Sequence, residues 1–213
     1  MIKTIIFDFD GVIVDSVQVG FEANQKFCQK MGKKIFTDIN DFKSKLSNHW
    51  PGVFLDHGIS LETIRDTQVN TFQDYTLEHQ ERIKLLENME SIIKELSQKY
   101  KLAIVSFNYQ PLIESILKRH NLLDHFSYIV DGHKFKSKSE GIKDCLNKFN
   151  IQNHEAIFIG DMVNDIFHGR DSNVKTIILH SHSWNHKEDI IKNNPDILID
   201  NTNQILEVLK NDK

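Results

Sequence analysis

The chain has 213 residues, enough for one large domain or for a mid-sized domain that carries a smaller insertion. Hydrophobic residues make up 39% of it, which argues against a disordered chain, and a formal net charge of −4 argues against a basic surface for nucleic acid. No apolar run approaches the roughly 18 residues of a membrane-spanning helix, so we expect neither a membrane nor a nucleic acid as partner.

The first hydrophobic run is followed by a long helical segment. Residues 5–7 (Ile-Ile-Phe) have the unbroken apolar character of a strand that is buried on both faces. Residues 17–88 contain no convincing strand but two long helical stretches, 17–31 and 61–83. A connection of that length without structure would far exceed normal loops. We therefore predict an inserted helical domain at residues 17–88.

Beyond residue 89, short apolar runs alternate with amphipathic stretches. The predicted strands are 102–105, 128–130, 156–159, 176–179 and 197–199. The predicted helices between and after them are 90–99, 111–120, 139–149, 163–171 and 202–209. This alternation is typical of a doubly wound parallel sheet, so we predict one α/β core domain from residues 1–16 and 89–213.

Acidic and hydroxyl side chains follow three of the predicted strands. Asp8 and Asp10 follow the first, Ser106 follows the second, and Asp161 and Asp165 follow the fourth. The carboxyl ends of parallel strands meet at one edge of the sheet, where function collects. Several carboxylates repel one another there unless a hard cation is present, and oxygen-rich sites suit Mg²⁺. A single Asp at a strand end is often a helix cap, but capping explains the whole set poorly.

These residues resemble the motifs of the haloacid dehalogenase superfamily of phosphohydrolases. The run Asp8-Phe9-Asp10-Gly11-Val12 with Asp15-Ser16 resembles the first motif, Ser106 stands where the family keeps Ser or Thr, and Gly160-Asp161 with Asp165 resembles the last motif. The resemblance implies a Rossmann-like core with a helical cap domain at residues 17–88. It also implies a Mg²⁺-dependent phosphatase that hydrolyses a small phosphorylated metabolite through an aspartyl-phosphate intermediate.

The resemblance further implies a role for each carboxylate. Asp8 is expected to be the nucleophile, and Asp10 the acid that protonates the leaving group and then the base that activates water. Asp8, Asp161 and the backbone carbonyl of Asp10 are expected to hold Mg²⁺. Asp165 is expected to bind the metal through water or to orient its neighbours.

Substrate contacts are expected on the second motif and in the cap. Ser106 and the backbone N–H groups near it are expected to bind phosphoryl oxygens, which brings Phe107 and Asn108 to the substrate. Phe107 is bulkier than the small or polar residue that the family pattern leads us to expect. In the cap, Trp50 and its neighbour His49 are candidates for contacting the leaving group, although packing within the cap is the stronger interpretation of Trp50.

The third motif of the family departs from its usual form, so two lysines remain candidates. Ser137 and Glu140 make a capping box that puts Lys138 in the first turn of a helix, where the family's lysine often stands. Lys136 fits the spacing of the proline-containing subtype instead. We favour Lys138 as the residue that neutralises phosphoryl charge and keep Lys136 as the alternative.

Other interpretations of the sequence remain open. A phosphomutase of the β-phosphoglucomutase type shares the core residues, and a catalytically idle binding module uses the same fold. A true haloacid dehalogenase is disfavoured because its chemistry needs no acid at Asp10. His180, His182 and His186 have a spacing that is able to bind zinc, which we regard as a minor alternative.

The start of the chain and its cysteines predict a cytoplasmic protein. Met1-Ile2-Lys3 leads directly into the first strand, without the apolar stretch and cleavage site of a secretory signal. Cys28 and Cys145 are too few for a disulfide framework and suit a reducing compartment. We expect a monomer or homodimer that acts on a small phosphorylated substrate.

Overall fold

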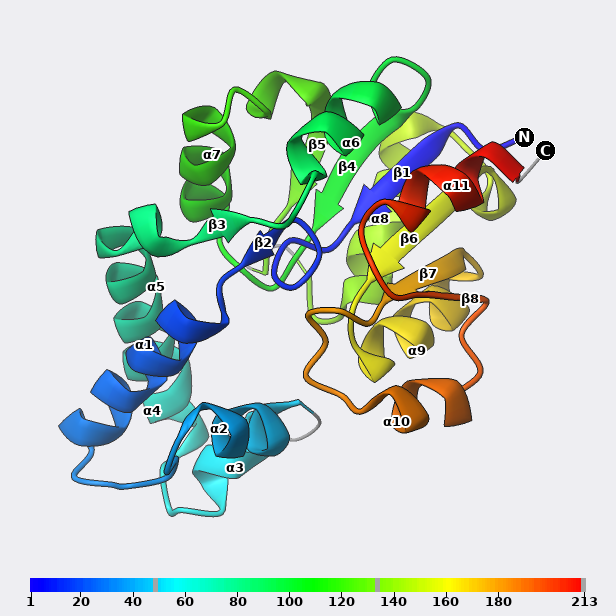
Figure 1. The fold of residues 1–213 in the computed structure, drawn as a ribbon. Helices are drawn as coiled ribbons and strands as arrows, with labels where there is room; N and C mark the ends of the chain where they lie inside the picture. Colours follow the sequence, from blue (N-terminus) through cyan, green and yellow to red (C-terminus); the bar gives the residue numbers. More distant parts are fainter. Residues whose placement is uncertain (48–49, 133–134, 212–213) are drawn as a thin grey trace. The chain divides into compact units, whose positions relative to one another are not determined.

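A six-stranded sheet forms the centre of the first of two units in the computed structural model, which describes residues 1–47, 50–132 and 135–211 (Figure 1). This unit comprises Met1–Asp15 and Lys84–Lys213. Its strands are β1 (Thr4–Phe7), β4 (Lys101–Val105), β5 (Phe126–Val130), β6 (Ala156–Gly160), β7 (Lys175–Leu179) and β8 (Ile197–Ile199). They lie in the order β5-β4-β1-β6-β7-β8, and every neighbouring pair is parallel. The predicted doubly wound parallel sheet is thus confirmed.

The strand order creates one switch point in the sheet. From β1 the chain runs outward through β4 to β5, and then returns to place β6 on the other side of β1. Phe7 of β1 pairs with Ile159 of β6, so the two strands end side by side. Connections that leave in opposite directions open a crevice beyond the strand ends, and this is where open α/β sheets bind ligands.

Helices and short turns connect the strands of this unit. The helices are α6 (Met89–Leu96), α7 (Gln110–Arg119), α8 (Lys138–Phe149), α9 (Val163–Ser172), α10 (Lys187–Lys192) and α11 (Gln204–Asn211). Helices α8 and α9 pack against each other, α8 also contacts β4 and β5, and α9 contacts β6 and β7. Ile142 and Cys145 of α8 lie with Ile6 and Phe158 of the sheet in one buried cluster. The apolar stripe predicted for residues 139–149 therefore faces the sheet.

A small antiparallel sheet also belongs to this unit. Strands β2 (Val14–Asp15) and β3 (Lys84–Leu85) pair Val14 with Leu85 and Asp15 with Lys84. The sequence predicted no strand between residues 17 and 88, and β3 differs from that expectation. A strand of two residues is too short to show a periodic pattern, which explains the difference.

The second unit, Ser16–Ile83, is helical in its described part. It contains α1 (Val17–Lys30), α2 (Ile39–Leu46), α3 (Gly52–Leu55), α4 (Leu61–Thr63), a π-helical turn at Ile64–Gln68, α5 (Val69–Glu78) and a 3₁₀ turn at Gln80–Arg82. The helix predicted for residues 61–83 therefore contains a π-helical turn near its start and ends at Glu78. The core of the second unit contains buried aromatic rings, and Phe36 packs edge-on against both Phe42 and Phe54.

Polar contacts join α1 to the segment that closes the second unit. The guanidinium of Arg82 donates two hydrogen bonds to the carboxylate of Glu22, at 2.6 and 2.7 Å. Inside the unit, Gln68 Nε2 donates to Asn24 Oδ1 at 2.9 Å, and both side chains are buried. Buried amides that satisfy each other fix the register of α1 against its neighbour. In the described part of the chain, no helix has both the length and the apolarity needed to cross a membrane.

Candidate active site

Three buried carboxylates converge where β1 and β6 end. Asp8 directly follows β1 and Asp161 directly follows β6, and the two residues are 4% and 3% exposed. Asp165 lies in the first turn of α9 and is buried as well. One oxygen from each of these three carboxylates lies within 4.8 Å of the others. The parallel pairing of β1 with β6 therefore brings together residues that are separated by more than 150 positions in the sequence.

Asp165 is held by the start of its own helix. Its Oδ2 accepts hydrogen bonds from the backbone N–H groups of Asp161 at 3.1 Å and Met162 at 3.0 Å. A carboxylate in this position satisfies N–H groups that the first helical turn leaves open. Gly160 permits the close approach, since a Cβ there would lie 2.4 Å from the Cβ of Asp165. Asp165 is thus hydrogen-bonded to the backbone of Asp161, and its two predicted roles, orienting its neighbours and binding a metal through water, stay predictions.

Gly11 makes room for Asp161 from the side of β1. Its φ of +76° is rare for residues with a side chain, and a Cβ at this position would lie 2.4 Å from Asp161 Oδ2. The turn around Gly11 is closed by backbone hydrogen bonds from Gly11 to Val14 at 2.8 Å and from Ile13 to Phe9 at 2.9 Å. The conformation and the packing both require glycine here.

Lys138 joins two of the three carboxylates. Ser137 caps α8 by accepting a hydrogen bond from the N–H of Glu140, and Lys138 is the first residue of the helix. The Lys138 ammonium contacts Asp8 Oδ2 and donates to Asp165 Oδ1 at 2.8 Å. Lys136 is exposed instead, and its backbone N–H donates to Glu140 Oε2 at 2.9 Å. Of the two candidate lysines, Lys138 is the one that reaches the carboxylates.

The electrostatics of this cluster leave negative charge unbalanced. Burial raises the pKa of Asp8 to about 7, against the opposing effect of the Lys138 ammonium. Burial and the neighbouring carboxylates of Asp165 and Asp8 raise the pKa of Asp161 well above its ordinary value. Burial lowers the pKa of Lys138, but the same two carboxylates outweigh it and keep the group protonated. The two raised carboxyl pKa values record carboxylates that have lost water without gaining a sufficient partner.

The donor set fits a hard divalent cation. Three close carboxylates face the ammonium of Lys138. In the described part of the chain, Lys138 forms ion pairs with Asp8 and Asp165, and none with Asp161. Oxygen ligands with excess negative charge are what Mg²⁺ prefers, and a cation among them would bring the raised carboxyl pKa values down again. The carboxylate of Asp10 is not part of this group, so only its backbone carbonyl remains as a predicted metal ligand.

Asp10 is held beside the cluster by Asn108. Asn108 Nδ2 lies 3.1 Å from Asp10 Oδ2, while Asn108 Oδ1 accepts from the N–H of Tyr109 at 2.9 Å. The second contact determines which end of the amide faces Asp10. Ser106 is buried at the end of β4, and its hydroxyl oxygen accepts from the N–H of Asn108 at 3.1 Å. The predicted acid–base residue and the predicted phosphate-binding residue are thus linked through one loop.

The remaining candidates lie elsewhere or carry weaker support. Phe107 is exposed at the carboxyl end of β4, next to Ser106. Trp50 belongs to the second unit and is exposed, so its contact with a substrate stays a prediction, and His49 lies outside the described residues. Among the described residues, the zinc alternative gains no support, because the group of potential metal ligands found there contains no histidine.

Two residues of this site were not singled out by the sequence. Asn185 is buried and its Oδ1 accepts from the N–H of Val163 at 2.9 Å, which anchors the start of α9. Gly132, after β5, lies so close to the Phe107 carbonyl oxygen that a Cβ would be 2.5 Å from it. Neither residue has a sequence signal of its own, because each acts through a contact that is distant along the chain.

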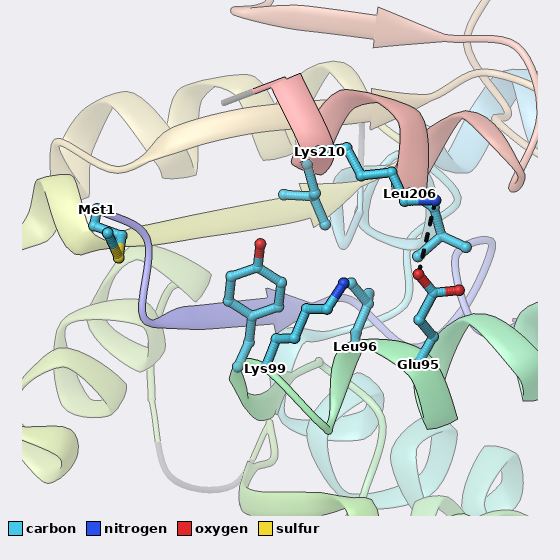
Figure 2. A pocket seen from close by; sticks show the side chains of 8 residues that line it. Met1, Glu95, Leu96, Lys99, Leu206 and Lys210 are labelled. Atoms are coloured by element: carbon cyan, nitrogen blue, oxygen red, sulfur yellow. Dashed lines mark ion pairs between the residues drawn. The ribbon is translucent and has the colours of Figure 1, made fainter. Parts of the chain in front are cut away.

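A pocket at the opposite end of the sheet is separate from this site. It is lined by Met1, Glu95, Leu96, Lys99, Tyr100, Leu206, Leu209 and Lys210 (Figure 2). Met1 precedes β1 and Tyr100 precedes β4, so the pocket lies at the amino ends of the strands. Its one marked ion pair, between Lys210 and Glu95 at 3.8 Å, links α11 to α6. It contains none of the predicted site residues.

Comparison with known proteins gives a consistent result. A family model described as haloacid dehalogenase-like hydrolase matches residues 5–179. The chain is 24% identical to a phosphoglycolate phosphatase from Vibrio vulnificus, over 98% of this chain and 96% of that protein. It is 24% identical to the pyrophosphatase PpaX from Bacillus pumilus, with the same coverage of both. The structure of a predicted phosphatase from Clostridium acetobutylicum has the same fold, with a TM-score of 0.86 at 18% identity and 99% coverage of each chain.

Proposed function

Since the chain belongs to the haloacid dehalogenase-like hydrolase family, we propose that it is a phosphatase that hydrolyses the phosphate ester of a small metabolite. The observation that carries the proposal is the buried contact between the Lys138 ammonium and the Asp8 carboxylate at the switch point of the sheet. A carboxylate in that place is able to attack phosphorus, and the ammonium beside it neutralises charge on the phosphoryl oxygens.

The chemistry proceeds in two steps. In the first, an Asp8 oxygen bonds to phosphorus, the ester P–O bond breaks, and the leaving oxygen takes a proton from the Asp10 carboxyl group. In the second, the Asp10 carboxylate takes a proton from a water molecule whose oxygen bonds to phosphorus, and the bond to Asp8 breaks to release phosphate. The hydrogen bond from Asn108 keeps the Asp10 carboxylate in one orientation through both steps.

Mg²⁺ is the proposed cofactor. Asp8, Asp161 and the backbone carbonyl of Asp10 would hold it, with Asp165 orienting Asp161 through the backbone. When bound, it would neutralise the carboxylates and polarise the phosphoryl oxygens. The Ser106 hydroxyl, which accepts from the N–H of Asn108, and the N–H group of Phe107 would bind the remaining phosphoryl oxygens.

Residues 17–88 are proposed as the helical cap that selects the leaving group, and Trp50 as one of its substrate contacts. The helical character of Ser16–Ile83 supports the first proposal, and the exposure of Trp50, at 53%, supports the second. The names of the two sequence relatives add phosphoglycolate and pyrophosphate to the substrates worth testing.

Phosphate release from a panel of substrates tests the proposal. The panel contains phosphoglycolate, pyrophosphate, hexose phosphates and an aryl phosphate, each assayed with Mg²⁺ and with EDTA. We expect release that needs Mg²⁺ and that falls at least about a thousandfold in Asp8→Asn, because the nucleophile is lost. Full activity after chelation would contradict the metal site, and wild-type turnover by Asp8→Asn would contradict the nucleophile. Isomerisation of a hexose phosphate without phosphate release would indicate a mutase instead.

A thermal shift gives a measurement of the metal site that does not depend on turnover. Mg²⁺ that binds only the folded protein raises its melting temperature, and the rise grows with the logarithm of the Mg²⁺ concentration above the dissociation constant. We expect the shift in the wild type and in Asp66→Asn, which alters an exposed carboxylate of the second unit. We expect it to be lost in Asp161→Asn.

A further inference from the structure

An exposed aromatic side chain lies beside the candidate active site. Phe107 directly follows Ser106 and is 56% exposed, although a phenyl ring is costly to leave in water. Its ring lies 5.3 Å from that of Phe135 and 6.4 Å from the imidazole of His168. Burial lowers the pKa of His168, so its ring is neutral at neutral pH. One part of the Phe107 ring is thus packed against other rings, and the rest stays open.

The position of Phe107 is fixed by its backbone. Gly132 packs against the Phe107 carbonyl, and the N–H of Gly132 donates to the carbonyl of Asn108 at 3.2 Å. The N–H of Ser106 donates to the carbonyl of Val130 at 3.1 Å. These contacts tie the loop after β4, which carries the exposed ring, to the end of β5.

The same ring contacts the catalytic machinery. Lys138 Nζ lies 5.8 Å from the centre of the Phe107 ring, within the range of a cation–π contact. The same ammonium contacts Asp8, which in the proposed reaction bonds to phosphorus. The exposed ring and the proposed nucleophile therefore contact the same ammonium group.

We propose that Phe107, supported by Phe135 and His168, is a specificity-determining residue that favours phosphate esters with a planar, apolar leaving group. The proposal rests on the proposed phosphatase function and narrows its substrate class. Aromatic groups gain from stacking beyond the burial of their surface, whereas a small charged leaving group such as glycolate gains nothing from a phenyl face. We therefore expect esters with an aromatic leaving group to bind better than phosphoglycolate or pyrophosphate, the compounds in the names of the two relatives.

Binding of two phosphonates tests the proposal without turnover. Phenylphosphonate and methylphosphonate share the group that binds at Asp8, resist hydrolysis, and differ in the ring. Calorimetric titration of the Mg²⁺-loaded protein is expected to give about tenfold tighter binding of phenylphosphonate. In Phe107→Ala we expect that preference to fall to within about twofold, and in Phe107→Trp we expect it to persist because a flat ring is retained.

Phe167→Ala is the matched control. Phe167 is also a phenylalanine of the first unit, 41% exposed, but its ring contact is with Arg170. We expect this variant to keep the wild-type preference. An unchanged preference in Phe107→Ala would overturn the proposal, and so would an equal loss of affinity for both phosphonates, which would mean that Phe107 only positions Lys138. If the wild type bound both phosphonates without preference, this inference alone would fail. If it bound neither, the proposed phosphatase function would fail as well.

Discussion

The absence of a Cβ atom at Gly11 leaves room for the Asp161 carboxylate beside Asp8. The space that a Cβ of residue 11 would need is taken by the Asp161 carboxylate. Gly58 in the second unit has a similar φ, +74° against +76° for Gly11, but a Cβ there would meet nothing within 4 Å. The two glycines therefore separate the cost of a backbone conformation from the cost of a displaced carboxylate.

We predict that Gly58→Ala loses about 1–2 kcal/mol of unfolding free energy from backbone strain, and that Gly11→Ala loses at least as much, because the displaced Asp161 carboxylate adds to the same strain. Gly11→Ala is also expected to lose at least about tenfold in turnover and in Mg²⁺ affinity, since small displacements of reacting groups are costly. Urea denaturation measures the first effect, and kinetics with Mg²⁺ titration measure the second. Equal activity in the two variants would show that the contact with Asp161 has no role in the reaction.

Helix α8 shows how an element delivers a side chain to the site. Its cap at Ser137 places Lys138 as the first helical residue, where the side chain is buried against Asp8 and Asp165. Lys136 precedes the cap and is exposed. Two lysines that are only two residues apart therefore differ in burial, because Lys138 lies inside the helix and Lys136 lies before its cap.

Replacement of each lysine by methionine tests this division. Lys138→Met leaves two buried carboxylates without their ammonium, so we expect a loss of about 3–5 kcal/mol in unfolding free energy and at least about a hundredfold in turnover. Lys136→Met is expected to change both little, because the Lys136 side chain is exposed and its hydrogen bond to Glu140 is made by the backbone N–H. Thermal melts and kinetics of the two proteins provide the measurements. A large loss of turnover in Lys136→Met with normal Lys138→Met would reverse the assignment.

Much of this element-scale structure was predictable, and the exceptions have physical causes. Buried parallel strands show as unbroken apolar runs, so β4, β6 and β7 were found within one residue of their observed bounds. The capping box predicted the start of α8, although Glu140 accepts from Lys136 and not from the cap residue itself. Helix α10 was missed because its six residues, Lys187–Lys192, are too few for a clear period.

In the candidate site, the carboxylates were predictable from the sequence, but the contacts around them were not. The carboxylates of Asp8 and Asp161 were found from the sequence because each directly follows an apolar run that is recognisable as a strand. The contacts of Asn185 with Val163 and of Phe107 with His168 join elements that are distant in sequence, so no local pattern indicated them. Sequence reasoning proposed which groups react, and the structure adds which groups contact them.

At the scale of the whole molecule, the helical unit is an insertion with adjacent ends. Asp15 and Lys84 are paired residues of the antiparallel strands β2 and β3, and the N–H of Leu86 donates to the carbonyl of Ile13 at 2.9 Å. Directly opposed residues in such a pair lie about 5 Å apart. The connection from Asp15 to Lys84 therefore needs only a turn, and the core of the first unit is continuous without Ser16–Ile83.

We predict that the first unit folds alone when residues 16–83 are replaced by an Asn-Gly turn, a sequence that favours two-residue hairpins. Closing so short a loop costs little entropy, and the six-stranded sheet keeps its full set of pairings. Urea denaturation is expected to show one cooperative transition with a smaller slope than the full chain, because less surface is exposed on unfolding. Mg²⁺ should still stabilise this protein, since Asp8, Asp161 and Asp165 all belong to the first unit. The same deletion with Asp161→Asn is the control and should not respond to Mg²⁺. A broad transition with exposed apolar surface would contradict the prediction, because it would mean that the sheet depends on the inserted helices for its stability.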